Sequence, residues 1–165
     1  MSITVPSSGD DFSSSLFGDP VANTLNGFML GSATSTTSVT LSTTSAFAGS
    51  ATVTFTLSAQ TRVKITTLAT MVPAGTSSAR YDVQAGYNSG SSASIGSITK
   101  LGISFLIGIE GGGTTGRNQT GIALGTVLLS AGTYTAYAAI TRTSGGDAGD
   151  AFNSFQTLVE FCGYT

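Results

Sequence analysis

The stretch TGIALGTVLLSAGTYTAYAAITRT, residues 120–143, decides the fold class. Its first half closes on an apolar run at residues 127–129, and the small residues 130–132 that follow favour a turn in which Gly132 takes a positive φ. Residues 133–142 then mix β-branched, aromatic and small side chains without a breaker, which is typical of a strand. The stretch therefore predicts two strands joined by a tight hairpin turn.

The same kind of pattern recurs through the chain after residue 50. Residues 51–57 (ATVTFTL) and 61–72 (TRVKITTLATMV) alternate apolar with polar side chains, and the short link between them predicts a second antiparallel hairpin. Residues 101–110 (LGISFLIGIE) are apolar on both faces, which predicts a strand in the centre of a sheet. Further strands are expected at residues 80–87 and 152–164, the last with Phe155, Thr157, Val159 and Phe161 facing inward.

No segment shows a helical apolar period with caps. Short strands separated by turn-forming loops predict an all-β fold, an antiparallel jelly-roll β-sandwich of about eight strands with an extended N-terminal arm. The chain has no Trp and one Cys, which argues against an immunoglobulin domain. We expect the arm at residues 1–45 and the sandwich at residues 46–165.

The N-terminal segment has its own composition. Residues 1–45 contain three aspartates and no cation, yet they hold recurring apolar side chains that a disordered linker normally lacks. Two alternatives are open: an arm that docks these side chains on the parent domain or a neighbour, or one or two additional strands, with a tight hairpin at Asn26 and Gly27. The contact residues expected of an arm are Phe12, Leu16, Phe17, Phe28 and Leu30.

Composition excludes several functions. Only 8% of the residues are charged and the net charge is −2, against a charged fraction of roughly 25% in typical soluble domains. Six dispersed cations do not match a run of phosphates, so we expect no nucleic-acid partner. No apolar run reaches the ~18 residues of a membrane span. The first cation is Arg62, so we expect no secretory signal.

The single cysteine allows no internal disulfide. Cys162 falls in the last expected strand, where the sequence favours a small buried apolar role. The alternative is a contact with a symmetry mate or another partner.

The residues also argue against catalysis and against a cofactor or metal. The chain has no His, which removes Ser-His and Cys-His pairs. Residues 111–116 (GGGTTG) fit G-x-G-x-x-G, but a loop and a strand follow where a nucleotide site needs a helix. Asp147 and Asp150 are too few for calcium, which takes six to eight oxygens. Nothing in the sequence brings Glu110 near Asp147 as a glycosidase pair.

Residues 128–135 (LLSAGTYT), followed by a strand that ends near Arg142, resemble the late hairpin of TNF/C1q-like jelly rolls. Such domains occur in virion proteins of tailed bacteriophages, namely head decoration (cement) proteins and the heads of fibres. Residues 53–57 and 62–65 look like the opening hairpin of the same domain. The resemblance covers residues 50–165 in the order of the elements.

The resemblance implies a structural virion protein rather than an enzyme. A decoration protein of this kind forms a homotrimer on the capsid surface, binds the major capsid protein and stabilises the contacts between capsomers. One alternative is a tail, fibre or receptor-binding component of the virion. Another is a carbohydrate-binding module with Tyr81, Tyr87, Tyr134 or Tyr137 as a stacking platform, although these tyrosines are better explained as strand residues.

Overall fold

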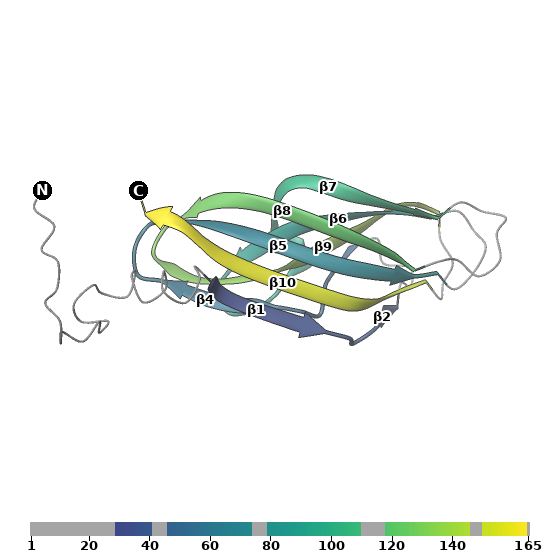
Figure 1. Ribbon diagram of the computed structural model, residues 1–165, viewed down its shortest axis with the longest axis horizontal. Helices are drawn as coiled ribbons and strands as arrows, with labels where there is room; N and C mark the ends of the chain where they lie inside the picture. The colour runs from purple at the N-terminus through teal and green to yellow at the C-terminus, as the bar shows by residue number, and fades with distance from the viewer. Residues whose placement is uncertain (1–28, 41–45, 74–78, 110–117, 146–149, 165) are drawn as a thin grey trace, which may run out of the picture.

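The computed structural model describes residues 29–40, 46–73, 79–109, 118–145 and 150–164. Within these residues, two antiparallel sheets of five strands each pack face to face (Figure 1). The predicted all-β sandwich is therefore confirmed. The helical content of the described residues is a single 3₁₀ turn, Ile95–Ser97.

Sheet A has the strand order β1-β10-β5-β8, with β2 also paired to β10. Its strands are β1 (Met29–Ser35), β2 (Val39–Thr40), β5 (Thr61–Val72), β8 (Gln119–Leu129) and β10 (Ala151–Tyr164). Sheet B has the order β3-β9-β6-β7, with β4 also paired to β9. Its strands are β3 (Ala46–Ala48), β4 (Val53–Leu57), β6 (Ala79–Ser89), β7 (Thr99–Ile109) and β9 (Gly132–Gly145).

The strands form because every second side chain has a core to enter. In β4 the side chains of Val53, Phe55 and Leu57 are buried and the threonines between them are exposed. In β5 every second residue from Thr61 to Met71 is buried. These are the inward faces that the sequence predicts for both segments.

The ladders of the sandwich are nested. β6 pairs with its neighbour β7, β5 with β8, β4 with β9, and β1 with β10. Along the sequence, β6 and β7 are the innermost pair, and each further pair flanks the one before it, with β1 and β10 outermost.

Both predicted hairpins are wrong. β8 pairs with β5 in sheet A, whereas β9 pairs with β3, β4 and β6 in sheet B. β4 and β5 likewise belong to opposite sheets. In each case the short link crosses from one sheet to the other, with Gly132 at a φ of +154° after the second crossing. A short link requires only that the ends of the two strands lie close together. The cross-sheet arrangement is favoured because both strands can then bury their apolar faces in one core.

The expected central position of residues 101–110 is also wrong for the part that the structure describes. β7 lies at the end of sheet B, with β6 as its ladder partner. The ladder is irregular between Val83 and Ala85, and Gly102 there has a φ of +65°. At this irregularity β7 approaches β8 of the other sheet, which lies beside it in Figure 1.

Of the two alternatives for the N-terminal segment, additional strands are observed at residues 29–35 and 39–40. β1 runs antiparallel to β10, with Ser35 opposite Phe155, and β2 pairs with Phe152 and its neighbour at the other end of β10. Residues 1–28, which include the suggested Asn26–Gly27 hairpin, lie outside the described residues.

The core holds a cluster of aromatic rings. Phe152 is fully buried, with ring centroids 5.6 Å from Phe47, 5.6 Å from Tyr81 and 6.4 Å from Phe155. The Tyr81 hydroxyl donates a 2.9 Å hydrogen bond to the buried carboxylate of Asp150. The polar tip of the ring is therefore satisfied within the core.

A polar network fastens the loop that follows β6. The Tyr137 hydroxyl donates a hydrogen bond to the side-chain oxygen of Asn88 and accepts one of 3.0 Å from the Ser94 amide. Asn88 also accepts from the Ser94 amide at 2.9 Å and donates to Ser97 at 3.0 Å. Burial raises the pKa of Tyr137, because the charged phenolate is disfavoured away from water. Tyr137 therefore acts as a neutral structural group that holds the loop.

Candidate interaction surface

The two outer faces of the sandwich differ in chemistry. The outer face of sheet A carries a group of large aliphatic side chains, which we call the apolar face. It consists of Met29 of β1, Leu68 of β5, Leu158 of β10, and Ile122, Leu124 and Leu128 of β8. Four of these are more than two-fifths exposed: Ile122 and Leu124 at 55%, Met29 at 46% and Leu128 at 42%.

The ladder registers place these side chains in rows across the sheet. Ile122 lies opposite Leu68. Leu124 lies opposite Thr66, which lies opposite Leu158. Neighbouring strands are about 4.8 Å apart, so side chains in one row contact each other or the residue between them. Ile122, Leu68, Leu124 and Leu158 therefore form a contiguous apolar group, whereas Met29 lies in the row of Glu160 and Lys64, and Leu128 lies opposite Arg62.

β8 has an inverted pattern, with small residues inward and large residues outward. Gly121, Ala123 and Gly125 are buried while Ile122 and Leu124 are exposed. The cause is the close approach of β7: a Cβ on Gly125 would lie 2.5 Å from the Cβ of Leu101. Because only small side chains fit beneath residues 121–125, Ile122 and Leu124 are left on the outside, whereas Leu129 at the end of β8 is buried.

Beside the apolar face lies a groove of about 520 Å³ between β7 and β8, which we call the β7–β8 groove. Its lining residues are Gly102, Ser104, Phe105, Ile122, Ala123, Leu124, Gly125 and Thr126. Phe105 is 44% exposed at this rim. The groove extends the apolar face around the edge of the sandwich, and exposed apolar areas of this kind often mark contact sites.

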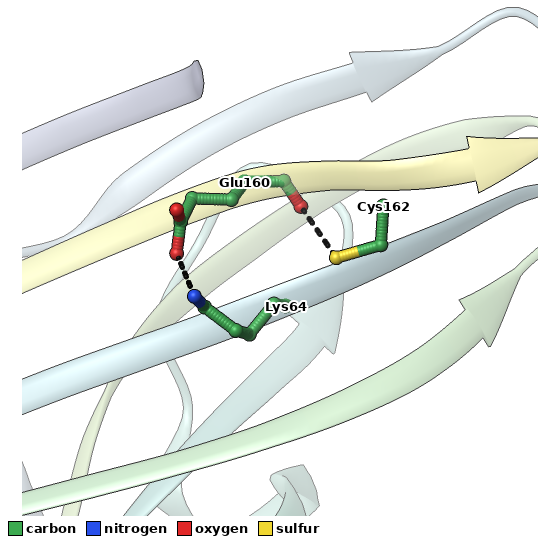
Figure 2. Close-up of polar contacts among 3 residues, drawn as sticks. All are labelled: Lys64, Glu160 and Cys162. Atoms are coloured by element: carbon green, nitrogen blue, oxygen red, sulfur yellow. Dashed lines mark hydrogen bonds and ion pairs between the residues drawn. The ribbon is translucent and has the colours of Figure 1, made fainter. Parts of the chain in front are cut away.

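An ion pair marks the end of sheet A next to β1 (Figure 2). Lys64 Nζ lies 2.6 Å from Glu160 Oε2. The hydrogen bond to the Glu160 carboxylate, and then its negative charge, raise the pKa of Lys64, so the Lys64 ammonium stays protonated at neutral pH. Both side chains are partly solvated, so the pair contributes little to stability.

Cys162 lies next to this pair, with its Sγ 4.0 Å from the carbonyl oxygen of Glu160 (Figure 2). Its thiol is exposed, so the predicted buried role is wrong. The alternation that buries Phe155, Thr157 and Val159 puts the even-numbered residues that follow Phe155, Cys162 among them, on the outer face. The alternation of the strand therefore predicts the exposure of Cys162 better than the general tendency of cysteine to be buried.

The outer face of sheet B is hydroxyl-rich. The Oγ1 atoms of Thr54 and Thr135, and those of Thr56 and Thr133, lie 3.0 Å apart across β4 and β9. Lys100 donates a 2.9 Å hydrogen bond to Thr141. Thr54, Thr56 and Thr133 are exposed and Thr135 is buried, so the described threonines of sheet B that reach the solvent present hydroxyls, in contrast to the aliphatic side chains of sheet A.

Only one of the predicted arm contacts lies among the residues that the structure describes. Leu30 lies in β1 and packs, half-buried, against the core cluster that contains Val53 and Val159. Its side chain thus belongs to the sandwich interior. Phe12, Leu16, Phe17 and Phe28 lie outside the described residues.

The suggested sugar-stacking tyrosines do not form an exposed platform. Tyr81, Tyr134 and Tyr137 are buried, and Tyr87 is half-buried with its ring edge-on to Tyr134 at 6.0 Å. Their interpretation as strand residues is confirmed.

The other candidate motifs are only partly visible. Asp150 is buried and bonded to Tyr81, whereas residues 111–116, Glu110 and Asp147 lie outside the described residues. The described part of the chain contains no group of three or more His, Cys, Asp or Glu side chains placed to hold a metal ion. In the same residues no helix has the length and apolarity to cross a membrane.

Comparison with known families and with curated protein sequences gives no match for this chain.

Proposed function

We propose that this chain is a structural virion protein, a head decoration (cement) protein that binds the major capsid protein through the apolar face. The observation that carries the proposal is the one-sidedness of the sandwich: large aliphatic side chains gather on sheet A, while sheet B presents threonines. A protein that coats a larger assembly needs one face for the assembly and one for water.

The nested strand pairing supports the resemblance to jelly-roll virion proteins. In a jelly roll two Greek keys fold a long hairpin into two sheets. The nested ladders β1–β10, β4–β9, β5–β8 and β6–β7 are what such a scheme would produce, and they support the proposal. The proposed homotrimer and the location on the capsid come from the same resemblance.

The proposed mechanism is mechanical and needs no bond chemistry. Burial of apolar surface contributes roughly 25 cal/mol per Å², and specific interfaces remove about 1,200–2,000 Å² from water. Decoration subunits that bridge adjacent capsomers would hold them together with this free energy.

Stoichiometry in purified particles tests the proposal. We expect the chain in purified virions at a copy number comparable with that of the major capsid protein, measured by quantitative mass spectrometry. A few copies per particle would favour the tail or fibre alternative. Absence from the virion would overturn both.

A charge on the apolar face should weaken capsid binding. Leu124→Lys is expected to lower affinity for undecorated capsids at least about tenfold, because a buried leucine side chain is worth roughly 1.5–3 kcal/mol. Co-sedimentation with capsids measures the change. The matched control is Thr56→Lys, which adds the same charge to the outer face of sheet B. Equal losses in both variants would contradict docking through sheet A.

A further inference from the structure

We propose that copies of this chain meet through the β7–β8 groove, with Phe105 of one copy seated beside Ile122 and Leu124 of the next. The inference rests on the homo-oligomer of the proposed function and goes further, because it assigns the contact between copies to particular side chains. Four features of the groove support this contact: its exposed side chains, its shape, its lack of charge and its area.

The groove gathers most of the large apolar side chains that the described residues leave exposed. Of the five such side chains, Phe105 reaches the groove from β7, and Ile122 and Leu124 reach it from β8. The other two, Met29 and Leu128, lie elsewhere on sheet A. Phenylalanine is enriched and charged residues are depleted at the centre of protein interfaces. The composition of the groove is therefore that of a protein contact.

The groove and a side chain able to enter it lie on the same edge of the sandwich. The small residues Gly102, Ala123 and Gly125 form part of its lining, and about 520 Å³ is open. This volume falls within the roughly 300–1,000 Å³ that accommodates a drug-sized molecule, so an aromatic ring fits. Phe105 stands at the rim and is 44% exposed. Because each copy offers both a ring and a hollow, the surface fits a copy of itself.

The groove carries no charged side chain in the part of the chain that the structure describes. Its lining consists of glycine, alanine, serine, threonine, phenylalanine, isoleucine and leucine. The one cation of β7, Lys100, donates its hydrogen bond to Thr141 of β9. Like charges that face each other oppose binding, and copies that meet through a charged surface meet this cost. An uncharged groove avoids it and offers a foreign partner no charge to recognise.

The area of the groove favours a closed ring over an isolated pair. Phe105, Ile122 and Leu124 are each about half-exposed, so together they present on the order of 300 Å² per copy. Two copies then bury on the order of 600 Å² of this surface, less than the roughly 1,200–2,000 Å² of a stable two-body interface. In a ring every copy makes the contact twice, and the second contact forms at a high effective concentration. The proposed homotrimer is such a ring.

Light scattering on the purified full chain, over a series of concentrations, tests the proposal without any capsid. We expect an oligomer, with about three times the chain mass of 16.5 kDa for the proposed trimer. Phe105→Asp puts a charge into each contact and should raise the dissociation constant at least about a hundredfold. The matched control, Thr56→Asp, adds the same charge to the exposed outer face of sheet B and should leave the mass unchanged.

Ile122→Asp repeats the test from the β8 side of the groove. Both side chains are exposed in the single chain, so we expect both variants to keep their fold, which denaturation in urea checks. A monomeric native chain at every concentration would overturn the proposal, as would an unchanged mass in either folded variant. Loss of the fold in both variants would also overturn it, because the two side chains would then support the fold and not a contact. None of these results depends on whether the protein is found in virions, so this proposal and the proposed function fail separately.

Discussion

Replacing Gly102 with alanine should lower the free energy of unfolding by about 3–5 kcal/mol, a large share of the roughly 5–15 kcal/mol typical of a domain. Two costs add. Gly102 has a φ of +65°, where a residue with a Cβ loses about 1–3 kcal/mol. The added Cβ also overlaps the carbonyl oxygen of Leu124. A backbone atom cannot rotate aside, so β7 and β8 must separate.

Gly90→Ala is the matched control for this substitution. Gly90 also has a positive φ, +93°, but no atom lies within 4 Å of a Cβ built there. This variant should lose only the conformational term, about 1–2 kcal/mol. Equilibrium denaturation in urea measures both variants. If their losses are equal, the contact between β7 and β8 is not a constraint and our account of the groove is wrong.

Replacing Phe152 with alanine should cost about 3–5 kcal/mol of unfolding free energy, the usual loss for a fully buried phenylalanine. Phe152 is 0% exposed and contacts the rings of Phe47, Tyr81 and Phe155. Because these rings come from both sheets, neither sheet alone can move to fill the cavity. The denaturant midpoint should fall with little change in the slope of the transition.

Phe105→Ala provides the same chemical change at the rim of the groove. Phe105 is partly exposed, so its loss should cost about 1 kcal/mol or less. Similar costs at Phe105 and Phe152 would show that the ring cluster does not organise the core.

The fold class was predictable because alternation is a local signal. Val53, Phe55 and Leu57 reveal one buried face without reference to any other segment. Strand pairing is not local. The link after Leu57 and the link after Leu129 both resemble hairpin turns, yet each joins opposite sheets. The choice depends on where distant strands lie, and no turn residue encodes it.

The apolar face was not predicted because β8 reverses the usual rule. If large apolar side chains pointed inward, as is usual, Ile122 and Leu124 would lie inside and Gly121, Ala123 and Gly125 outside. The available signal was the regular spacing of small residues, which indicates close backbone approach. The partner in that approach, Gly102 of β7, becomes visible only in three dimensions.

The nested pairing has a consequence for how the protein is made. β1, β2 and β5 all hydrogen-bond to β10, the last of the described strands to leave the ribosome. Sheet A therefore closes only after synthesis has passed residue 164, and the nascent chain keeps open strand edges until then. Contacts this distant in sequence also slow folding, to the millisecond-to-second range usual for all-β domains. A ribosome that stops before β10 releases an aggregation-prone fragment and not a smaller folded domain.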